Sequence, residues 1–495
     1  MHVQVWLDAD ALTRWHLELV RSLARRHDTT ASVRLLPERT WSTRRSVDTL
    51  LTLERRLHGL RRGLTAREDI SAVDVYLNNS EPADLAIDLV GADPQPGTRT
   101  WRLRFDGAVG IEPAISALLR GRFPVVTLED LRTEEQVAGG RPGSESPGVA
   151  SASLDDVLAR CTSLIHAALD GSGARGVATS PVETPKASAL IKQGLAQTAG
   201  AAAHGIYRRA FRAPHWRVGW RFVCDDDVID LEGHPAGGWN DLPDDGFHFY
   251  ADPFPIEVDG RTHLFVEDFD HRVGRGVISV VEFDEAGPIG RPAPVLSHDV
   301  HLSYPHVFEA DGEVWLIPET SAAKRVELYR ATHFPAEWEL EGVLLDDVEA
   351  NDATVFRHDG QWWMTATVTD GGSHCDALYV WHSPDLRGPW TAHRGNPVVI
   401  DITSARPAGH VVRRGERLIR PVQDCATGYG AALGLMEIVR LDEFAFDQRA
   451  IAHITPGTSW PGRRIHTLNR AGRLECIDGS RLVPRFRIRS EGDTP

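Results

Sequence analysis

Carboxyl groups recur at matching points of a pattern that repeats along the chain. Each of three copies opens on a polar residue, runs through an apolar stretch to an Asp-Gly pair, and continues into a second apolar stretch. Asp252, Tyr304 and Asp352 open the copies, and the second stretch ends on Glu267 in the first copy and Glu319 in the second. Two facing carboxyl groups can serve as proton donor and as base or nucleophile, the chemistry that glycosidic cleavage needs.

The spacing of the copies indicates how these side chains could meet. The copies lie roughly 50 residues apart, in the range of propeller blades. Asp-Gly between two apolar stretches is a strong hairpin signal, because Gly tolerates the positive φ of such turns. The first strand of a hairpin begins where the second ends, so the opening and closing residues should share one face. If the hairpins are inner strands of radially arranged blades, that face is the mouth of a channel.

Two weaker copies extend the pattern. The fourth opens on Arg406 and closes on a run from Arg420 to Asp424, and the fifth begins near His466. Guanidinium binds carboxylate and phosphate, so Arg406 and Arg420 form either structural ion pairs or a clamp for an anionic ligand. The side chains predicted to contact a ligand at the mouth are Tyr250, Glu267, Tyr304, His306, Arg406, Arg420, Gln423, Asp424 and His466. For His306, a core histidine is the alternative.

Composition excludes several classes of function. The 495 residues include 70 acidic and 54 basic residues, a net charge of −16, which disfavours non-specific binding to nucleic acid. Five scattered cysteines without a Cys-x-x-Cys pair argue against a disulfide framework or a zinc knuckle. We find no signal-peptide pattern and no run of roughly 20 apolar residues. A soluble cytoplasmic protein without a membrane span is therefore predicted.

The chain divides into three predicted regions. Residues 1–130 alternate strands with helices, which predicts a small Rossmann-like α/β domain with a mostly parallel sheet. Residues 131–214 are predicted to be a flexible and helical linker, and residues 215–488 an all-β domain. Within these regions we expect a helix at 50–64, a strand at 74–79, mobile stretches at 132–153 and 171–185, and helices at 154–169 and 187–211.

Several short runs carry a family resemblance. They are Tyr250-Ala251-Asp252-Pro253-Phe254, Leu302-Ser303-Tyr304-Pro305, Pro318-Glu319-Thr320-Ser321, Ala405-Arg406-Pro407-Ala408-Gly409, Arg420-Pro421-Val422-Gln423-Asp424-Cys425 and His466-Thr467-Leu468-Asn469. With these runs, the region from about Trp216 to Leu482 resembles the N-terminal region of plant glucosamine inositolphosphorylceramide transferases and their bacterial relatives. It is also similar to the five-bladed propellers of arabinanases, furanosidases, invertases and levansucrases, which implies a five-bladed propeller here.

The resemblance also implies roles for the carboxyl groups. Asp252 would be the base or nucleophile, and Asp352 would tune pKa values and hold a sugar hydroxyl; the alternative is that both cap turns. The resembled hydrolases place their acid where this chain has Arg406. We therefore expect Glu319 to be the acid, with a pKa raised by apolar surroundings, and Glu267 to stay ionised. Either Glu could instead pair with an arginine.

Further implications concern the metal, the front domain and the function. In some resembled propellers a channel His helps to hold Ca²⁺, so calcium near His466 is a prediction; no other cofactor is expected. Residues 1–130 look like the formyltransferase N-terminal fold, but the segment 101–107 lacks the His of its working site, so an inactive domain is predicted.

The predicted function is a carbohydrate-active enzyme that cleaves or transfers a glycosyl unit of a sugar or anionic glycoconjugate. The alternatives are a non-catalytic glycan-binding module and a propeller recruited to lyase or cyclase chemistry.

Overall fold

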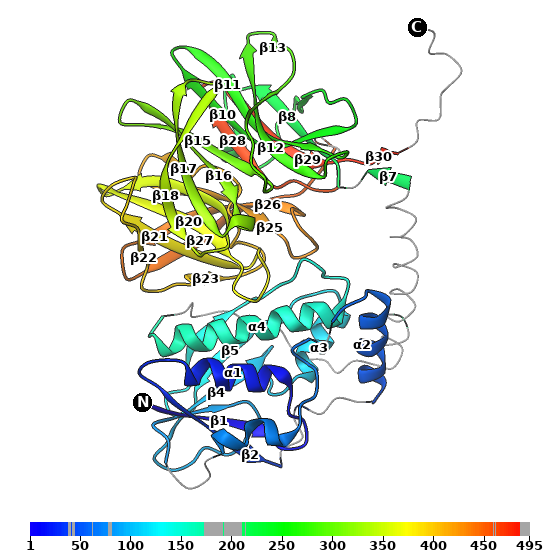
Figure 1. The fold of residues 1–495 in the computed structure, drawn as a ribbon, viewed down its shortest axis with the longest axis vertical. Helices are drawn as coiled ribbons and strands as arrows, with labels where there is room; N and C mark the ends of the chain where they lie inside the picture. Colours follow the sequence, from blue (N-terminus) through cyan, green and yellow to red (C-terminus); the bar gives the residue numbers. More distant parts are fainter. Residues whose placement is uncertain are drawn as a thin grey trace.

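The front domain lies below a β-propeller (Figure 1). The computed structural model describes residues 1–37, 41, 45–61, 63–77, 82–172, 192, 210–212, 214–458, 460 and 462–485. The predicted combination of a small α/β domain and a five-bladed propeller is confirmed. Among the described helices, none is long and apolar enough to cross a membrane.

A six-stranded sheet organises the front domain, in the order β2-β1-β3-β4-β5-β6. Its strands are β1 His2–Asp8, β2 Thr30–Leu36, β3 Leu85–Asp88, β4 Arg99–Phe105, β5 Val126–Asp130 and β6 Glu135–Gly140. The first four strands pair in parallel, whereas β5 and β6 are antiparallel. The helices are α1 Arg14–Ala24, α2 Arg45–Leu57, α3 Glu112–Leu119 and α4 Ala150–Leu169, and a 3-10 helix, η1, spans Ile70–Tyr76. The apolar faces of these elements form one core.

Three local predictions in this domain are wrong or displaced. The strand expected at 74–79 is occupied by the end of η1, and the helix expected at 50–64 begins earlier and ends at Leu57. The mobile linker expected at 132–153 instead contains β6 and the start of α4. Its glycines are required by close packing: a Cβ on Gly143 would lie 2.3 Å from the Ile402 side chain. The predictions for 171–185 and 187–211 fall almost entirely outside the described residues.

The propeller consists of five sheets. The first holds β10 His248–Val258, β11 Arg261–Asp270, β12 Arg275–Asp284, β13 Gly287–Pro288 and β14 Ala293–Leu296; the second holds β15 Ser303–Ala310, β16 Glu313–Thr320, β17 Arg325–His333 and β18 Glu337–Asp346. The third holds β19 Ala350–His358, β20 Gln361–Val368, β21 Ala377–Ser383, β22 Thr391–Ala392 and β23 Val399–Ile400; the fourth holds β24 Val412–Arg414, β25 Arg417–Asp424, β26 Ala432–Leu441 and β27 Phe446–Ile454.

The fifth sheet closes the ring with strands from both ends of the domain. It has the order β28-β29-β8-β9, with β28 Leu468–Ala471, β29 Leu474–Ser480, β8 Trp216–Phe222 and β9 Asn240–Asp241. Pairing of the last hairpin with β8 joins the end of the domain to its beginning within one blade, which holds the ring closed. Beside the ring, β7 Phe211–Arg212 pairs with β30 Val483–Pro484, and two short helices occur, α6 Val228–Leu231 and η2 Ser321–Ala323.

The front domain packs on the propeller along α4 and the segment after β6 (Figure 1). The backbone of Arg141 exchanges hydrogen bonds with Ile400 and Ile402, and both isoleucines belong to the front domain's core. Arg160 of α4 donates from Nε to Oδ1 of Asp376 over 2.7 Å, and both side chains are fully buried. The two domains are therefore joined through the loop between β20 and β21.

Candidate active site in the propeller channel

A backbone irregularity repeats in the innermost strands of the first three blades. The pairing of β10, β15 and β19 with the next strand shifts register around Asp252, Tyr304 and Asp352, and each of these residues has a positive φ, between 43° and 54°. Non-Gly residues rarely adopt this conformation, and it clusters at functional sites. The bulge turns the backbone N–H of each opening residue toward a carboxylate of a neighbouring strand.

Three amide hydrogen bonds show this arrangement. Asp252 N donates to Oδ2 of Asp478 over 3.0 Å, Tyr304 N donates to Oδ2 of Asp252 over 3.1 Å, and Asp352 N donates to Oε2 of Glu319 over 3.0 Å. The hairpin argument from the sequence thus places opening and closing residues at one face. The buried carboxylates are held in fixed positions by the backbone itself.

Arg406 occupies the side of the cluster formed by the second, third and fourth blades. Its Nε and Nη2 donate to the two oxygens of Asp352 over 2.6 and 3.2 Å, and Nη2 also reaches Oε2 of Glu319 over 3.5 Å. Gln423 Nε2 donates to Oδ2 of Asp352 over 2.9 Å. The guanidinium also lies over the Tyr429 ring, 5.0 Å from its centroid. Of the two alternatives for Arg406, the contacts show the structural ion pair.

His466 and Asp478 hold the other side of the cluster. The Nδ1 atom of His466 lies 2.7 Å from Oδ2 of Asp478 and 3.6 Å from Oδ1 of Asp252. Thr467 Oγ1 donates to Oδ1 of Asp252 over 2.8 Å. The His466 ring stacks on Trp216, with centroids 3.8 Å apart. Asp252 therefore sits among fixed hydrogen-bond donors in a fully buried setting.

Glu267 is the least paired carboxyl group of the cluster. Its Oε1 lies 3.4 Å from Nε2 of His301, and its side chain is 10% exposed. Burial raises the pKa of Glu267 well above its ordinary value, and the charges of Asp252, Glu319 and other neighbouring carboxylates add to the rise. Burial lowers the pKa of His301, so its ring is neutral near neutral pH. These surroundings favour the protonated form of Glu267.

The pKa values of the remaining carboxyl groups shift in different directions. Burial alone would raise the pKa of Glu319, but the charge of Arg406 and hydrogen bonds from Asp352 and Ser321 lower it below the ordinary value. Burial raises the pKa of Asp352 well above its ordinary range, although Arg406 opposes the rise. Burial also raises the pKa of Asp252, against the charge of His466. The pKa of Glu319 is lowered where we expected it to be raised, and the pKa of Glu267 is raised where we expected this group to stay ionised, because Arg406 reaches Glu319 and not Glu267.

Not all predicted ligand contacts lie in this cluster. Gln423 and His466 do, and Tyr304 contributes its backbone N–H while its hydroxyl bonds Thr354 and the backbone of Gly409. Four other predicted side chains instead make contacts typical of a structural role. His306 is fully buried and bonds the backbone of Val355, Arg420 donates to backbone carbonyls of Ser404 and Ala405 and to Gln448, Asp424 pairs with His453, and Tyr250 packs among apolar side chains. For Arg420 and His306 the structural alternatives fit these contacts.

Several residues of the cluster were not predicted from the sequence. Asp478 directly follows the apolar run of β29, the position at which carboxylates end earlier second strands, so the repeat carried the information. His301, Trp216 and Tyr429 lie in loops or in the closing strand, where the repeat gives no signal. Thr467 is next to the predicted His466.

The calcium prediction concerns His466, and one ligand atom each of His466, Asp252 and Asp478 lies within 4.8 Å of the others. Both oxygens of Asp478 already accept hydrogen bonds from backbone N–H groups of Asp252, His466 and Thr467. These donors stabilise the buried carboxylate of Asp478 without a cation, and they occupy lone pairs of both of its oxygens. The residues therefore do not fit a cation without rearrangement, and calcium near His466 stays a prediction.

The fold and the cluster define a five-bladed propeller with a buried group of carboxylates at its inner strands. Residues 241–476 match the family model of the N-terminal region of glucosamine inositolphosphorylceramide transferase 1. Over 365 residues the chain is 30% identical to the glucosamine inositolphosphorylceramide transferase 1 of Oryza sativa subsp. japonica. This alignment covers 63% of this chain and 48% of that protein. It is 29% identical over 252 residues to the Arabidopsis thaliana protein of the same name, covering 48% of this chain and 33% of that protein.

The chain therefore spans about half the length of the curated relatives it matches. Solved structures with a similar arrangement include a family 117 glycoside hydrolase of Zobellia galactanivorans, with a TM-score of 0.34 and 12% identity over 49% of this chain and 77% of that chain. A GH43_1 enzyme of Xanthomonas citri in complex with xylotriose has a TM-score of 0.33 and 11% identity over 46% of this chain and 80% of that chain. The predicted likeness of residues 1–130 to the formyltransferase fold stays a prediction.

Proposed function

We propose that the chain is a carbohydrate-active protein whose propeller channel cleaves or transfers a glycosyl unit of a glycoconjugate. The proposal is supported by the buried cluster of carboxyl groups that holds Glu267 and Asp252, in which burial and the neighbouring carboxylates raise the pKa of Glu267 well above its ordinary value. A carboxylic acid that keeps its proton at neutral pH can protonate the leaving oxygen, while a second carboxyl group acts as base or nucleophile.

The proposal changes the role of one residue. Glu319 accepts hydrogen bonds and faces Arg406, so it supports Asp352 and does not donate a proton. Glu267 takes the role of acid, Asp252 keeps the role of base or nucleophile, and Asp352 keeps its supporting role. The names of the plant relatives suggest a substrate that contains glucosamine, inositol phosphate and ceramide, and this class leads the panel of test substrates.

The test is turnover of a panel of furanosides, pyranosides and glucosamine-containing glycoconjugates by the wild type and two variants. Glu267→Gln and Asp252→Asn should each lower kcat by about 10²-fold or more, because each removes a proton-transfer or nucleophilic group. Glu257→Gln, in an exposed part of the same β10–β11 hairpin, is the matched control. A substrate with a strongly acidic leaving group needs no protonation and should restore much of the rate of Glu267→Gln only. Turnover that survives both substitutions would refute the proposal.

One observation favours a second candidate, a non-catalytic glycan-binding module. Asp352 is locked to Arg406 through both of its oxygens, which is typical of a structural ion pair. For a binding module, no substrate of the panel is turned over, whereas calorimetry detects glycan binding that Glu267→Gln and Asp252→Asn alter in parallel. Turnover by the wild type would exclude this candidate.

A further inference from the structure

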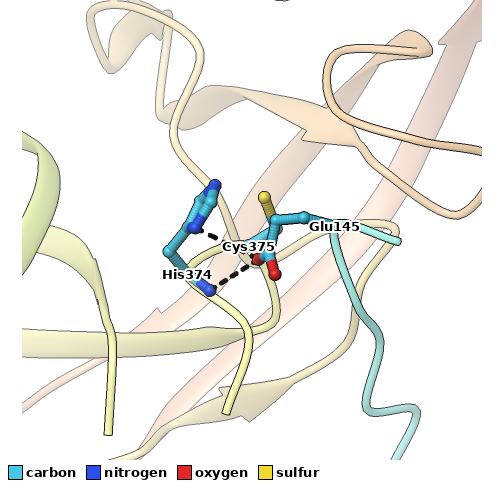
Figure 2. Close-up of side chains that lie close together, drawn as sticks. All are labelled: Glu145, His374 and Cys375. Atoms are coloured by element: carbon cyan, nitrogen blue, oxygen red, sulfur yellow. Dashed lines mark hydrogen bonds and ion pairs between the residues drawn. The ribbon is translucent and has the colours of Figure 1, made fainter. Parts of the chain in front are cut away.

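Three loops meet where the front domain contacts the propeller, and they bring together side chains typical of a metal site. Glu145 lies between β6 and α4 of the front domain, His374 and Cys375 lie between β20 and β21, and Cys425 directly follows β25. Figure 2 shows Glu145 approaching the loop of His374 and Cys375 from the opposite side. The four residues come from widely separated parts of the sequence, which is why the cysteine spacing gave no signal.

The contacts among these side chains are close. His374 Nδ1 lies 3.2 Å from Oε1 of Glu145, and the backbone N–H of His374 donates to the same oxygen over 2.8 Å. One ligand atom each from Glu145, His374 and Cys375 lies within 4.8 Å of the others. The Cys375 thiol is within hydrogen-bonding reach of both the His374 ring and the Cys425 thiol. The ligand atoms of Glu145, His374 and Cys375 thus converge at one place, and the Cys425 thiol lies beside that of Cys375.

The four side chains of the cluster differ in exposure, and this difference fits a bound ion better than a reactive thiol. Cys375 and Cys425 are each 1% exposed, whereas the side chains of Glu145 and His374 are 31% and 38% exposed. An ion could therefore enter from the carboxylate and imidazole side and reach the sulfur atoms. Both cysteines are free thiols in the structure. Burial raises the pKa of the Cys375 thiol well above its ordinary value, so without a bound cation the thiol is neutral and unreactive.

We propose that Glu145, His374, Cys375 and Cys425 form a four-coordinate zinc site that joins the front domain to the propeller. Cysteine sulfur, histidine nitrogen and carboxylate oxygen are the ligands that Zn²⁺ takes, and four protein ligands are typical of structural sites. Binding would deprotonate the two thiols and release their protons to solvent, so the affinity should rise with pH. Three ligands come from the propeller and one from the front domain, so the ion would couple the two domains.

The site would also act on the channel. The backbone oxygen of His374 accepts a hydrogen bond from Nη1 of Arg406 over 3.2 Å, and Arg406 holds Asp352 and Glu319. A metal bound to the His374 ring would fix the loop that carries this carbonyl, and with it the position of the guanidinium. Outer contacts of this kind orient functional groups without touching a substrate.

The test is titration of the reduced full chain with Co²⁺, followed by competition with Zn²⁺. Tetrahedral cobalt bound to thiolate has an intense sulfur-to-metal charge-transfer band in the near ultraviolet and ligand-field bands in the red. We expect one equivalent of Co²⁺ to produce both, Zn²⁺ to abolish them, and saturating Zn²⁺ to raise the Tm. Cys375→Ser and Cys425→Ser should each lower the affinity by more than about 100-fold and weaken the charge-transfer band.

Two further variants keep the test decisive. Cys224→Ser changes an exposed cysteine outside the cluster and should bind cobalt as the wild type does. Glu145→Gln should weaken binding while leaving the charge-transfer band per bound ion unchanged, and it substitutes a partly exposed side chain in case a buried serine prevents folding. The proposal is overturned if the wild type takes up no cobalt. It is equally overturned if the charge-transfer band persists in folded Cys375→Ser and Cys425→Ser proteins.

Discussion

The buried ion pair between Arg160 and Asp376 offers a sharp test of how the two domains are joined. Arg160 donates to Oδ1 of Asp376 over 2.7 Å, while Gly143 N donates to the other oxygen over 2.9 Å. Arg160 also donates to the carbonyl oxygens of Val368 and Ser373, over 2.9 and 2.6 Å. Both side chains of the pair have no exposed surface. The perturbation is Arg160→Met, which keeps most of the side-chain volume and removes the charge.

The expected loss of stability follows from these contacts. Removing one partner of a buried pair leaves an uncompensated charge and costs about 3–5 kcal/mol. Burial already raises the pKa of Asp376 against the charge of Arg160, so the variant will raise it further. A carboxyl group with a raised pKa contributes stability that is complete below its unfolded pKa and is lost as pH rises through its folded pKa. The destabilisation by Arg160→Met should therefore grow from pH 5 to pH 8.

The assay is denaturant unfolding followed by tryptophan fluorescence and circular dichroism. Arg325→Met is the matched control, because Arg325 pairs with Asp346 on the surface, where the side chains are 49% and 70% exposed; such pairs contribute about 0–1 kcal/mol. The double variant Arg160→Met with Asp376→Leu should recover part of the loss, since it removes the unpaired charge. A loss for Arg160→Met no larger than that of the control, or independent of pH, would refute the reasoning.

Three further predictions concern the propeller. The stability of Glu267→Gln relative to the wild type should rise from pH 4 to pH 8, because the raised pKa of Glu267 costs the wild type stability only above its unfolded pKa; unfolding at both pH values checks this, and a difference independent of pH would contradict it. Tyr304→Phe should cost about 1–3 kcal/mol in urea unfolding, because the buried N–H of Gly409 loses its acceptor; a neutral effect would show that water replaces the hydroxyl. Gly409→Ala should cost about 3 kcal/mol or more, since its Cβ would lie 2.2 Å from the carbonyl oxygen of Leu468, whereas Gly415→Ala, with no atom within 4 Å, should cost about 1–2 kcal/mol; equal losses would contradict the packing argument.

The propeller was predictable from sequence because its strongest signals are local. In the Asp-Gly turn Asp311-Gly312 both residues have positive φ. The apolar stretches before and after this turn are β15 and β16. Because the first strand of a hairpin begins where the second ends, the sequence also predicted that Asp252 and Asp352 lie at one face with Glu267 and Glu319. The positive φ of Asp252 itself was not predicted, because a bulge depends on the amide's partner in another blade.

The errors arose where distant contacts decide the outcome. The pKa values of Glu267 and Glu319 depend on which of them Arg406 reaches across the channel, and sequence spacing does not contain that distance. The stretch at 132–153 has the composition of a mobile linker, yet Gly140 and Gly143 are small so that the backbone can pack on Ile400 and Ile402. The composition of this stretch shows that it lacks the regular apolar spacing of a helix or strand. It does not show that the stretch lacks tertiary contacts.

The most direct test of the central claim is to measure the ionisation of Glu267. Carbon-13 NMR of protein labelled at glutamate side-chain carboxyl groups would follow each titration, and Glu267→Gln would assign the signal by its disappearance. We predict that one glutamate titrates well above the rest and that its signal is absent from the variant. A wild-type spectrum in which every glutamate titrates near the ordinary value would contradict the account of a proton-holding acid in the channel.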